Sequence, residues 1–264
     1  MGFLHEIVER TATEISRPEY GRFTAPSFGP RSSLRDAIRS SGALGALLVE
    51  FKRHSPGSDP PALPVRSPPE FVEATEPVGV AGYSCLATAH RFGGSPDDVA
   101  SLAAATRRPV LFKDFVIDPR QVEVARRAGA SAILLIARLE SEGLVRVPLA
   151  ELARVAHSHH LEVLLEFHEK AELRQAVGVS ADMFGVNVRD LDTLRMEPSV
   201  AAATLRAADG LRPLVGLSGV GSAADARRFW DLGVDAILVG SAVARAVDPA
   251  SFLSTLRRTA PGGS

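Results

Sequence analysis

The chain has 264 residues, of which 45% are hydrophobic and 23% are charged, the proportions of an ordinary globular protein. A formal net charge of -1 argues against a general binder of nucleic acid or of a membrane surface. Cys85 is the one cysteine, so no disulfide forms within the chain and no multi-cysteine zinc site exists. The N-terminal residues are too charged for a signal peptide, and no stretch is apolar enough to span a bilayer, so we expect a cytoplasmic protein.

The first 45 residues are predicted to form a helical extension. Residues 3–15 carry apolar side chains spaced along one helix face, and Pro18 ends that pattern. A second short helix is predicted at residues 33–38, with Ser33 as its N-terminal cap.

Short apolar runs and helical patterns alternate from residue 46 onward. The runs predict strands at residues 46–51, 78–86, 109–112, 132–136, 161–167, 183–186, 213–217 and 235–239. The helical patterns lie at residues 70–76, 96–106, 119–128, 149–157, 170–177, 198–207, 223–232 and 249–257. Asp118-Pro119 is typical of a helix start, with proline at the first helical position.

Eight strand–helix units in a chain of this length predict a (β/α)8 barrel, the TIM-barrel fold, formed by residues 1–264 as one domain. The alternative is a doubly wound open sheet, which would need a reversal of strand order that the sequence does not reveal.

Polar residues stand where several of these strands end, and a parallel barrel carries its active site at the C-terminal ends of its strands. The lysines and carboxylates among them are Glu50, Lys52, Lys113 and Glu166. Each of them taken singly fits a solvated ion pair at the rim, whereas two lysines and two carboxylates in one mouth are suited to move protons.

The loops after the seventh and eighth strands contain Ser218-Gly219 and Gly240-Ser241. Loops at these positions of a (β/α)8 barrel commonly hold a phosphate on backbone N–H groups, so we expect a phosphate site there.

Several motifs resemble the indole-3-glycerol phosphate synthase family over most of the chain. The core match is Val110-Leu-Phe-Lys113-Asp-Phe-Val-Ile-Asp-Pro119, and Glu50-Phe-Lys52-Arg-His-Ser55-Pro56 is similar to the family's Glu-x-Lys-x-x-Ser-Pro. Further similar segments are Phe92-Gly-Gly-Ser95, Glu162-Val-Leu-Leu-Glu166, Gly185-Val-Asn187-Val-Arg189 and the eighth strand ending in Gly240-Ser241.

The resemblance implies a role for each matching residue. Lys113 would be the general acid and Glu166 the general base, while Lys52 would assist proton transfer or bind the substrate carboxylate. Glu50 and Asn187 would hold hydroxyl groups and the reacting centre. The phosphate would lie among Ser55, Gly219, Gly240 and Ser241, with Ser218 and Arg189 also in the binding set.

Three departures from the family pattern concern the expected substrate. Leu217 stands before Ser218-Gly219, where the family has a glutamate. The first loop reads Ser55-Pro-Gly-Ser-Asp59 and runs into Pro60, and the second strand ends Leu86-Ala-Thr88, where the family has an acidic residue after Leu-Thr.

The implied activity is a carbon–carbon lyase that closes an indole ring on a small phosphosugar substrate. The implied chemistry needs no metal and no organic cofactor, and we expect a monomer or a homodimer. Two alternatives stay open: another phosphosugar reaction in a specialised pathway, or a non-catalytic binding protein.

The cluster His157, His159 and His160 is interpreted as a solvated helix end, because nothing nearby completes a metal site.

Overall fold

A closed barrel of parallel strands forms the centre of the computed structural model, which describes residues 2–57, 63–64 and 66–258. The strands are β1 (Ala46–Phe51), β2 (Gly82–Leu86), β3 (Val110–Lys113), β4 (Ala132–Ile136), β5 (Glu162–Phe167), β6 (Met183–Asn187), β7 (Leu214–Leu217) and β8 (Ala236–Val239). Each pairs in parallel with its neighbours, and β1 closes the ring against β8. The predicted (β/α)8 barrel is confirmed, and the open sheet is excluded because every described strand has two neighbours.

Alternate residues of the strands fill the inside of the barrel. Leu48, Leu111, Leu134, Leu164 and Val215 belong to one buried apolar cluster and are at most 1% exposed. Strands buried on both faces read as continuous apolar runs, which is why these segments were recognisable in the sequence. This apolar filling closes the barrel beneath the polar residues that follow at the C-terminal strand ends.

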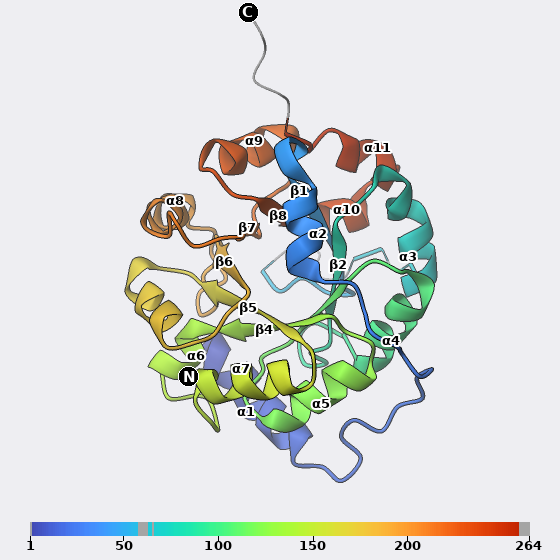
Figure 1. The fold of residues 1–264 in the computed structure, drawn as a ribbon, viewed down its shortest axis with the longest axis vertical. Helices are drawn as coiled ribbons and strands as arrows, with labels where there is room; N and C mark the ends of the chain where they lie inside the picture. The colour runs from blue at the N-terminus through green and yellow to red at the C-terminus, as the bar shows by residue number, and fades with distance from the viewer. Residues whose placement is uncertain (1, 58–62, 65, 259–264) are drawn as a thin grey trace, which may run out of the picture.

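Helices surround the barrel, as Figure 1 shows. They are α3 (Pro68–Thr75), α4 (Pro96–Ala105), α5 (Pro119–Arg127), α6 (Ala137–Ser141), α7 (Leu149–Ser158), α8 (Pro198–Ala207), α9 (Ala223–Asp231), α10 (Ser241–Arg245) and α11 (Pro249–Ser254). The predicted start of α5 is confirmed: the Asp118 carboxylate accepts from the Arg120 N–H, and Gln121 completes a capping box. Among the described residues, none of the helices is long and apolar enough to cross a membrane.

The helical extension consists of α1 (Phe3–Ile15), α2 (Leu34–Ser40) and a short 3-10 turn η1 (Gly42–Leu44). The Glu162 carboxylate, at the start of β5, accepts from the backbone N–H of Leu34 at 2.7 Å. This bond places α2 at the N-terminal end of the barrel. Phe3 of α1 instead meets Phe92, in the loop after β2, with ring centroids 6.3 Å apart. The extension thus reaches both ends of the barrel.

Two predicted elements differ from the structure. The second strand was expected from residue 78, but β2 begins at Gly82, because Glu76–Val78 forms a 3-10 turn η2 that Gly79 ends in the left-handed region. The helix predicted at residues 170–177 is the 3-10 helix η3 (Lys170–Val177). The remaining predicted elements have bounds within a few residues of the observed ones.

Candidate active site

One cavity of about 560 Å³ lies at the mouth of the barrel. The sequence singled out eleven residues, and all of them line this cavity: Glu50, Lys52, Ser55, Lys113, Glu166, Asn187, Arg189, Ser218, Gly219, Gly240 and Ser241. The barrel therefore brings together side chains that are far apart in the chain. The family's catalytic and binding roles for them remain predictions.

Glu50 and Lys52 lie on the inward face of β1 and just beyond its end. Lys52 Nζ is 2.7 Å from Glu50 Oε1, and the two side chains are 16% and 4% exposed. Burial alone would raise the pKa of Glu50, but the ammonium groups of Lys52 and Lys113 outweigh it and lower the pKa below the ordinary value. A Cβ at Gly240 would stand 2.7 Å from Glu50 Oε1, so the backbone of β8's end packs directly on this pair.

Lys113, Glu166 and Asn187 form the second polar group, from β3, β5 and β6. Lys113 Nζ lies 4.0 Å from Glu166 Oε2, and Asn187 Nδ2 donates to Glu166 Oε1 at 3.0 Å. Glu166 is 2% exposed, and among the described residues its Oε2 is a buried oxygen without a hydrogen-bond partner. A buried carboxylate with one hydrogen-bonded oxygen and one oxygen that has no hydrogen bond is suited to accept a proton from a bound molecule.

The candidate phosphate residues come from three loops. Ser241 Oγ donates to Ser55 Oγ at 3.0 Å, which joins the first and eighth loops. Ser218 and Gly219 both have positive φ, 63° and 76°, so the chain turns sharply directly after β7. Turns with successive N–H groups on one side form concave sites for anions.

Arg189 lines the cavity, but part of its guanidinium is bound to its own loop. Its Nη1 donates to the carbonyl of Leu194 at 2.7 Å, and burial lowers its pKa below the ordinary value. Its backbone N–H donates to Asn187 Oδ1 at 3.0 Å. Arg189 therefore also orients the Asn187 carboxamide, whose nitrogen faces Glu166.

An apolar wall separates Asn187 from the Glu50–Lys52 pair. Leu217 on β7 and Leu238 on β8 are 1% and 4% exposed and line the cavity side by side. A Cβ on Gly185 would stand 2.8 Å from Leu217 Cδ1, so the leucine lies across this glycine of β6. The position where the family has a glutamate is therefore filled by a well-packed side chain.

The sequence did not single out the aromatic side of the cavity. Phe3, Phe92 and Phe115 line it, and the rings of Phe92 and Phe115 have centroids 6.0 Å apart. The sequence shows Phe3 only as part of a helix face, and its nearness to the mouth depends on how α1 folds back. Phe92 opens a loop motif that resembles the family's, which was the one available signal.

The other two departures have different outcomes. Thr88 Oγ1 donates to Asp114 Oδ1 at 2.6 Å, so the end of the second strand holds a buried carboxyl from the third loop. Burial raises the pKa of Asp114. The first-loop departure at residues 58–61 lies outside the described residues.

The histidine cluster has a structural partner at the outside of the barrel. His157 Nε2 lies 2.9 Å from Asp182 Oδ2. Within the part of the chain that the structure describes, no group of three or more His, Cys, Asp and Glu side chains is arranged to hold a metal ion.

Taken together, the fold and the cavity define a (β/α)8-barrel protein whose mouth holds two lysine–carboxylate pairs. The family model for indole-3-glycerol phosphate synthase matches residues 5–256. "Indole-3-glycerol phosphate synthase 2" of Streptomyces coelicolor is 37% identical over 227 residues, covering 86% of this chain and 85% of the relative. "Indole-3-glycerol phosphate synthase" of Staphylococcus aureus strain MRSA252 is 33% identical over 261 residues, covering 97% and 98%. The chain belongs to the indole-3-glycerol phosphate synthase family.

Solved structures support the same fold. A 3-hexulose-6-phosphate synthase superposes with a TM-score of 0.63 at 14% identity, covering 80% of this chain and 97% of that one. Thiamine phosphate pyrophosphorylase from Pyrococcus furiosus superposes with a TM-score of 0.59 at 18% identity, covering 82% and 95%. At these identities the likeness concerns the barrel alone.

Proposed function

We propose that this protein converts 1-(2-carboxyphenylamino)-1-deoxyribulose 5-phosphate into indole-3-glycerol phosphate, carbon dioxide and water. The observation that carries the proposal is the facing pair Lys113 and Glu166, 4.0 Å apart, with Asn187 orienting the carboxylate. Family membership supplies the reaction. The protein would act as a cytoplasmic carboxy-lyase on a single small phosphosugar substrate, as a monomer or a homodimer.

Ring closure would begin with Lys113 as the general acid. Its ammonium group donates a proton to the ketone oxygen while the aromatic carbon that bears the carboxylate attacks the ketone carbon. A carbon–carbon bond forms, and the ketone oxygen becomes a hydroxyl group. Carbon dioxide then leaves, and its bonding electrons restore the aromatic ring. A positioned acid contributes about 10²–10⁴-fold to such a step.

Dehydration would follow, with Glu166 as the general base. Its carboxylate removes a proton from the methylene carbon next to the ring nitrogen, and the new hydroxyl group leaves as water after a lysine protonates it. Glu166 Oε2 is buried and has no hydrogen-bond partner among the described residues, so no hydrogen bond would have to break before it took up a substrate proton. Lys52, paired with Glu50 at 2.7 Å, would assist this transfer or bind the substrate carboxylate.

The remaining residues would fix the substrate's two ends. Glu50 and Asn187 would hold hydroxyl groups of the sugar chain near the reacting centre. Ser55 and Ser241, joined at 3.0 Å, would bind the phosphate with the turns at Gly219 and Gly240 and with Ser218. Arg189, at the edge of this set, would contribute positive charge.

The direct test is an assay of the purified protein with this substrate. Indole fluorescence should appear, with one carbon dioxide released for each indole-3-glycerol phosphate identified by mass. A non-catalytic homologue would bind the substrate without any increase in fluorescence, and an isomerase would change the sugar without releasing carbon dioxide. Either result would contradict the proposal.

A further inference from the structure

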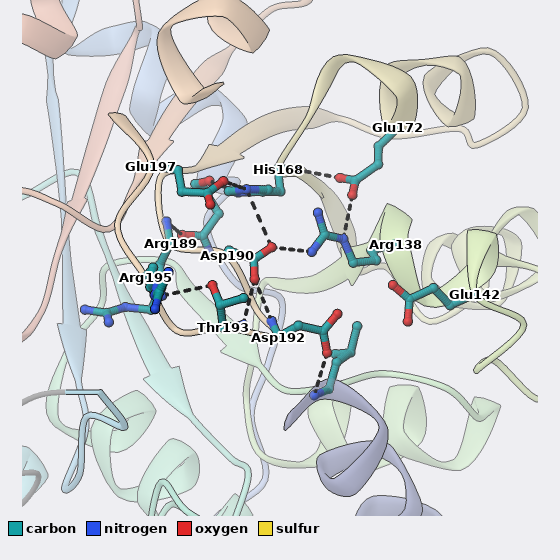
Figure 2. Close-up of polar contacts among 12 residues, drawn as sticks. Arg138, Glu142, His168, Glu172, Arg189, Asp190, Asp192, Thr193, Arg195 and Glu197 are labelled. Atoms are coloured by element: carbon teal, nitrogen blue, oxygen red, sulfur yellow. Dashed lines mark hydrogen bonds and ion pairs between the residues drawn. The ribbon is translucent and has the colours of Figure 1, made fainter. Parts of the chain in front are cut away.

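A group of charged side chains gathers among the segments that follow β4, β5 and β6 (Figure 2). Its members are Arg138, His168, Glu172, Asp190 and Glu197. His168, Glu172 and Asp190 are at most 8% exposed. Buried charges are costly unless each has partners, so the contacts within this group fix its geometry closely.

His168 contacts an acceptor with each of its ring nitrogens. Nδ1 is 2.8 Å from the carbonyl oxygen of Asn187, and Nε2 is 3.0 Å from Glu197 Oε2. A carbonyl oxygen only accepts, so Nδ1 carries a hydrogen and donates it to Asn187. The imidazole therefore joins residue 187, the last residue of β6, to residue 197, which directly precedes α8.

Arg138 fixes this histidine from the other side. Its Nε donates to Glu172 Oε1 at 2.8 Å and its Nη1 to Asp190 Oδ2 at 2.6 Å. Glu172 Oε2 in turn accepts from the backbone N–H of His168 at 2.6 Å. Asp190 Oδ2 also lies 3.6 Å from His168 Nε2, so the contacts close into a ring, as Figure 2 shows.

Asn187 connects this ring of charged side chains to Glu166, the candidate base. His168 binds the main chain of Asn187, and the side chain of Asn187 donates to Glu166 Oε1 at 3.0 Å. His168 itself is not among the described residues that line the cavity. Among the described contacts of its ring, the bond to Asn187 is the one that reaches a residue of the cavity.

We propose that His168 is a positioning residue, whose Nδ1–H bond fixes Asn187 and thereby the orientation of the Glu166 carboxylate. The inference rests on the proposed catalytic roles of Glu166 and Asn187. A displacement of about 1 Å at a reacting group lowers turnover about 100-fold, so loss of this one bond is expected to act on kcat.

Two substitutions of His168 separate the two ring nitrogens. The amide nitrogen of His168→Asn falls near the place of Nδ1, so it retains a donor to the Asn187 carbonyl. The amide nitrogen of His168→Gln falls near the place of Nε2, so it keeps a contact with Glu197 and loses the bond to Asn187. Both variants remove the same ring, so both are expected to lower the melting temperature by similar amounts.

The proposal expects kcat of His168→Asn within about threefold of the parent, and kcat of His168→Gln at least about tenfold lower, with KM little changed in both. Glu197→Ala is the matched control, because it removes the Glu197 carboxylate at Nε2 and leaves the Nδ1 bond to Asn187. Its kcat should stay within about threefold of the parent. Equal losses of kcat in the two His168 variants, or parental kcat in His168→Gln, would overturn the proposal.

Glu197→Ala also keeps the idea testable if a His168 variant does not fold. A loss of kcat above about tenfold in Glu197→Ala would show that the Glu197 side of the ring carries the effect. Failure of the proposed function itself is recognised separately: the parent would then produce no indole, or Glu166→Gln would turn over like the parent.

Discussion

Replacing Glu166 by glutamine separates a catalytic role from a structural one. Glutamine keeps an oxygen in the place of Oε1, so the bond from Asn187 Nδ2 survives. The amide nitrogen takes the place of Oε2, which has no hydrogen-bond partner among the described residues, so no hydrogen bond is lost there. What disappears is one negative charge 4.0 Å from the Lys113 ammonium group, together with the ability to take up a proton.

The size of the two effects differs. Unit charges 4.0 Å apart attract by about 4 kcal/mol at an effective dielectric constant of about 20. Burying the carboxylate costs several kcal/mol, which offsets most of this attraction. We therefore expect the free energy of unfolding to change by less than about 2 kcal/mol. Loss of a general base, in contrast, should lower turnover about 100-fold or more, which raises the activation barrier by about 2.7 kcal/mol.

The assay follows indole fluorescence at saturating substrate, with thermal unfolding of parent and variant in the same buffer. Binding of a substrate analogue whose ketone is reduced to an alcohol should survive the substitution. Lys113→Ala should lower turnover on the same scale. Parental turnover in Glu166→Gln, or a loss of turnover that only parallels a loss of folded protein, would refute the assigned role.

Three further predictions concern other parts of the site. Leu217→Glu should raise turnover of the proposed substrate; unchanged or abolished activity would show that Leu217 is an adaptation to a different substrate. Inorganic phosphate should inhibit competitively and lie beside Gly219 and Ser241 in a soaked crystal, so an anion found elsewhere on the barrel would count against the site. Burial alone would raise the pKa of Asp190, but bonds from Arg138 lower it well below its ordinary 3.8. Its stabilising effect is therefore complete above about pH 5 and is lost as the pH falls through the lowered folded-state pKa, a fall that Asp190→Asn should flatten in acid unfolding curves.

The strand–helix alternation was predictable because each strand is a short buried run between turn signals. The position of the mouth could be predicted from this alternation, since Lys113 is the last residue of β3 and Glu166 the last but one of β5. The start of β2 was predicted wrongly, because Val78 and Val80 look like strand residues. Gly79 adopts φ 72° between them, and the turn it makes is not encoded in the apolar pattern.

Contacts between loops could not be predicted from the sequence. His168 follows Glu166 by two residues, yet nothing in that spacing shows that its ring meets the Asn187 carbonyl and Glu197. That meeting depends on the register of β5 against β6 and on the path of the loop from residue 188 to 197. The place of Phe3 in the cavity likewise depends on α1 folding back against the loop after β2.

The apolar wall of Leu217 and Leu238 has a consequence for how this mouth can diversify. In an eight-stranded ring β7 lies across from β3, so the wall faces Lys113 rather than sharing a strand with the proton-transferring groups. Replacing either leucine changes the space that is available to a bound substrate and leaves Lys113 and Glu166 in place. Under the proposed roles, the residues that shape the space for the substrate and the residues that move protons thus lie on separate strands, and in a lineage of duplicated genes one set can change while the other is kept.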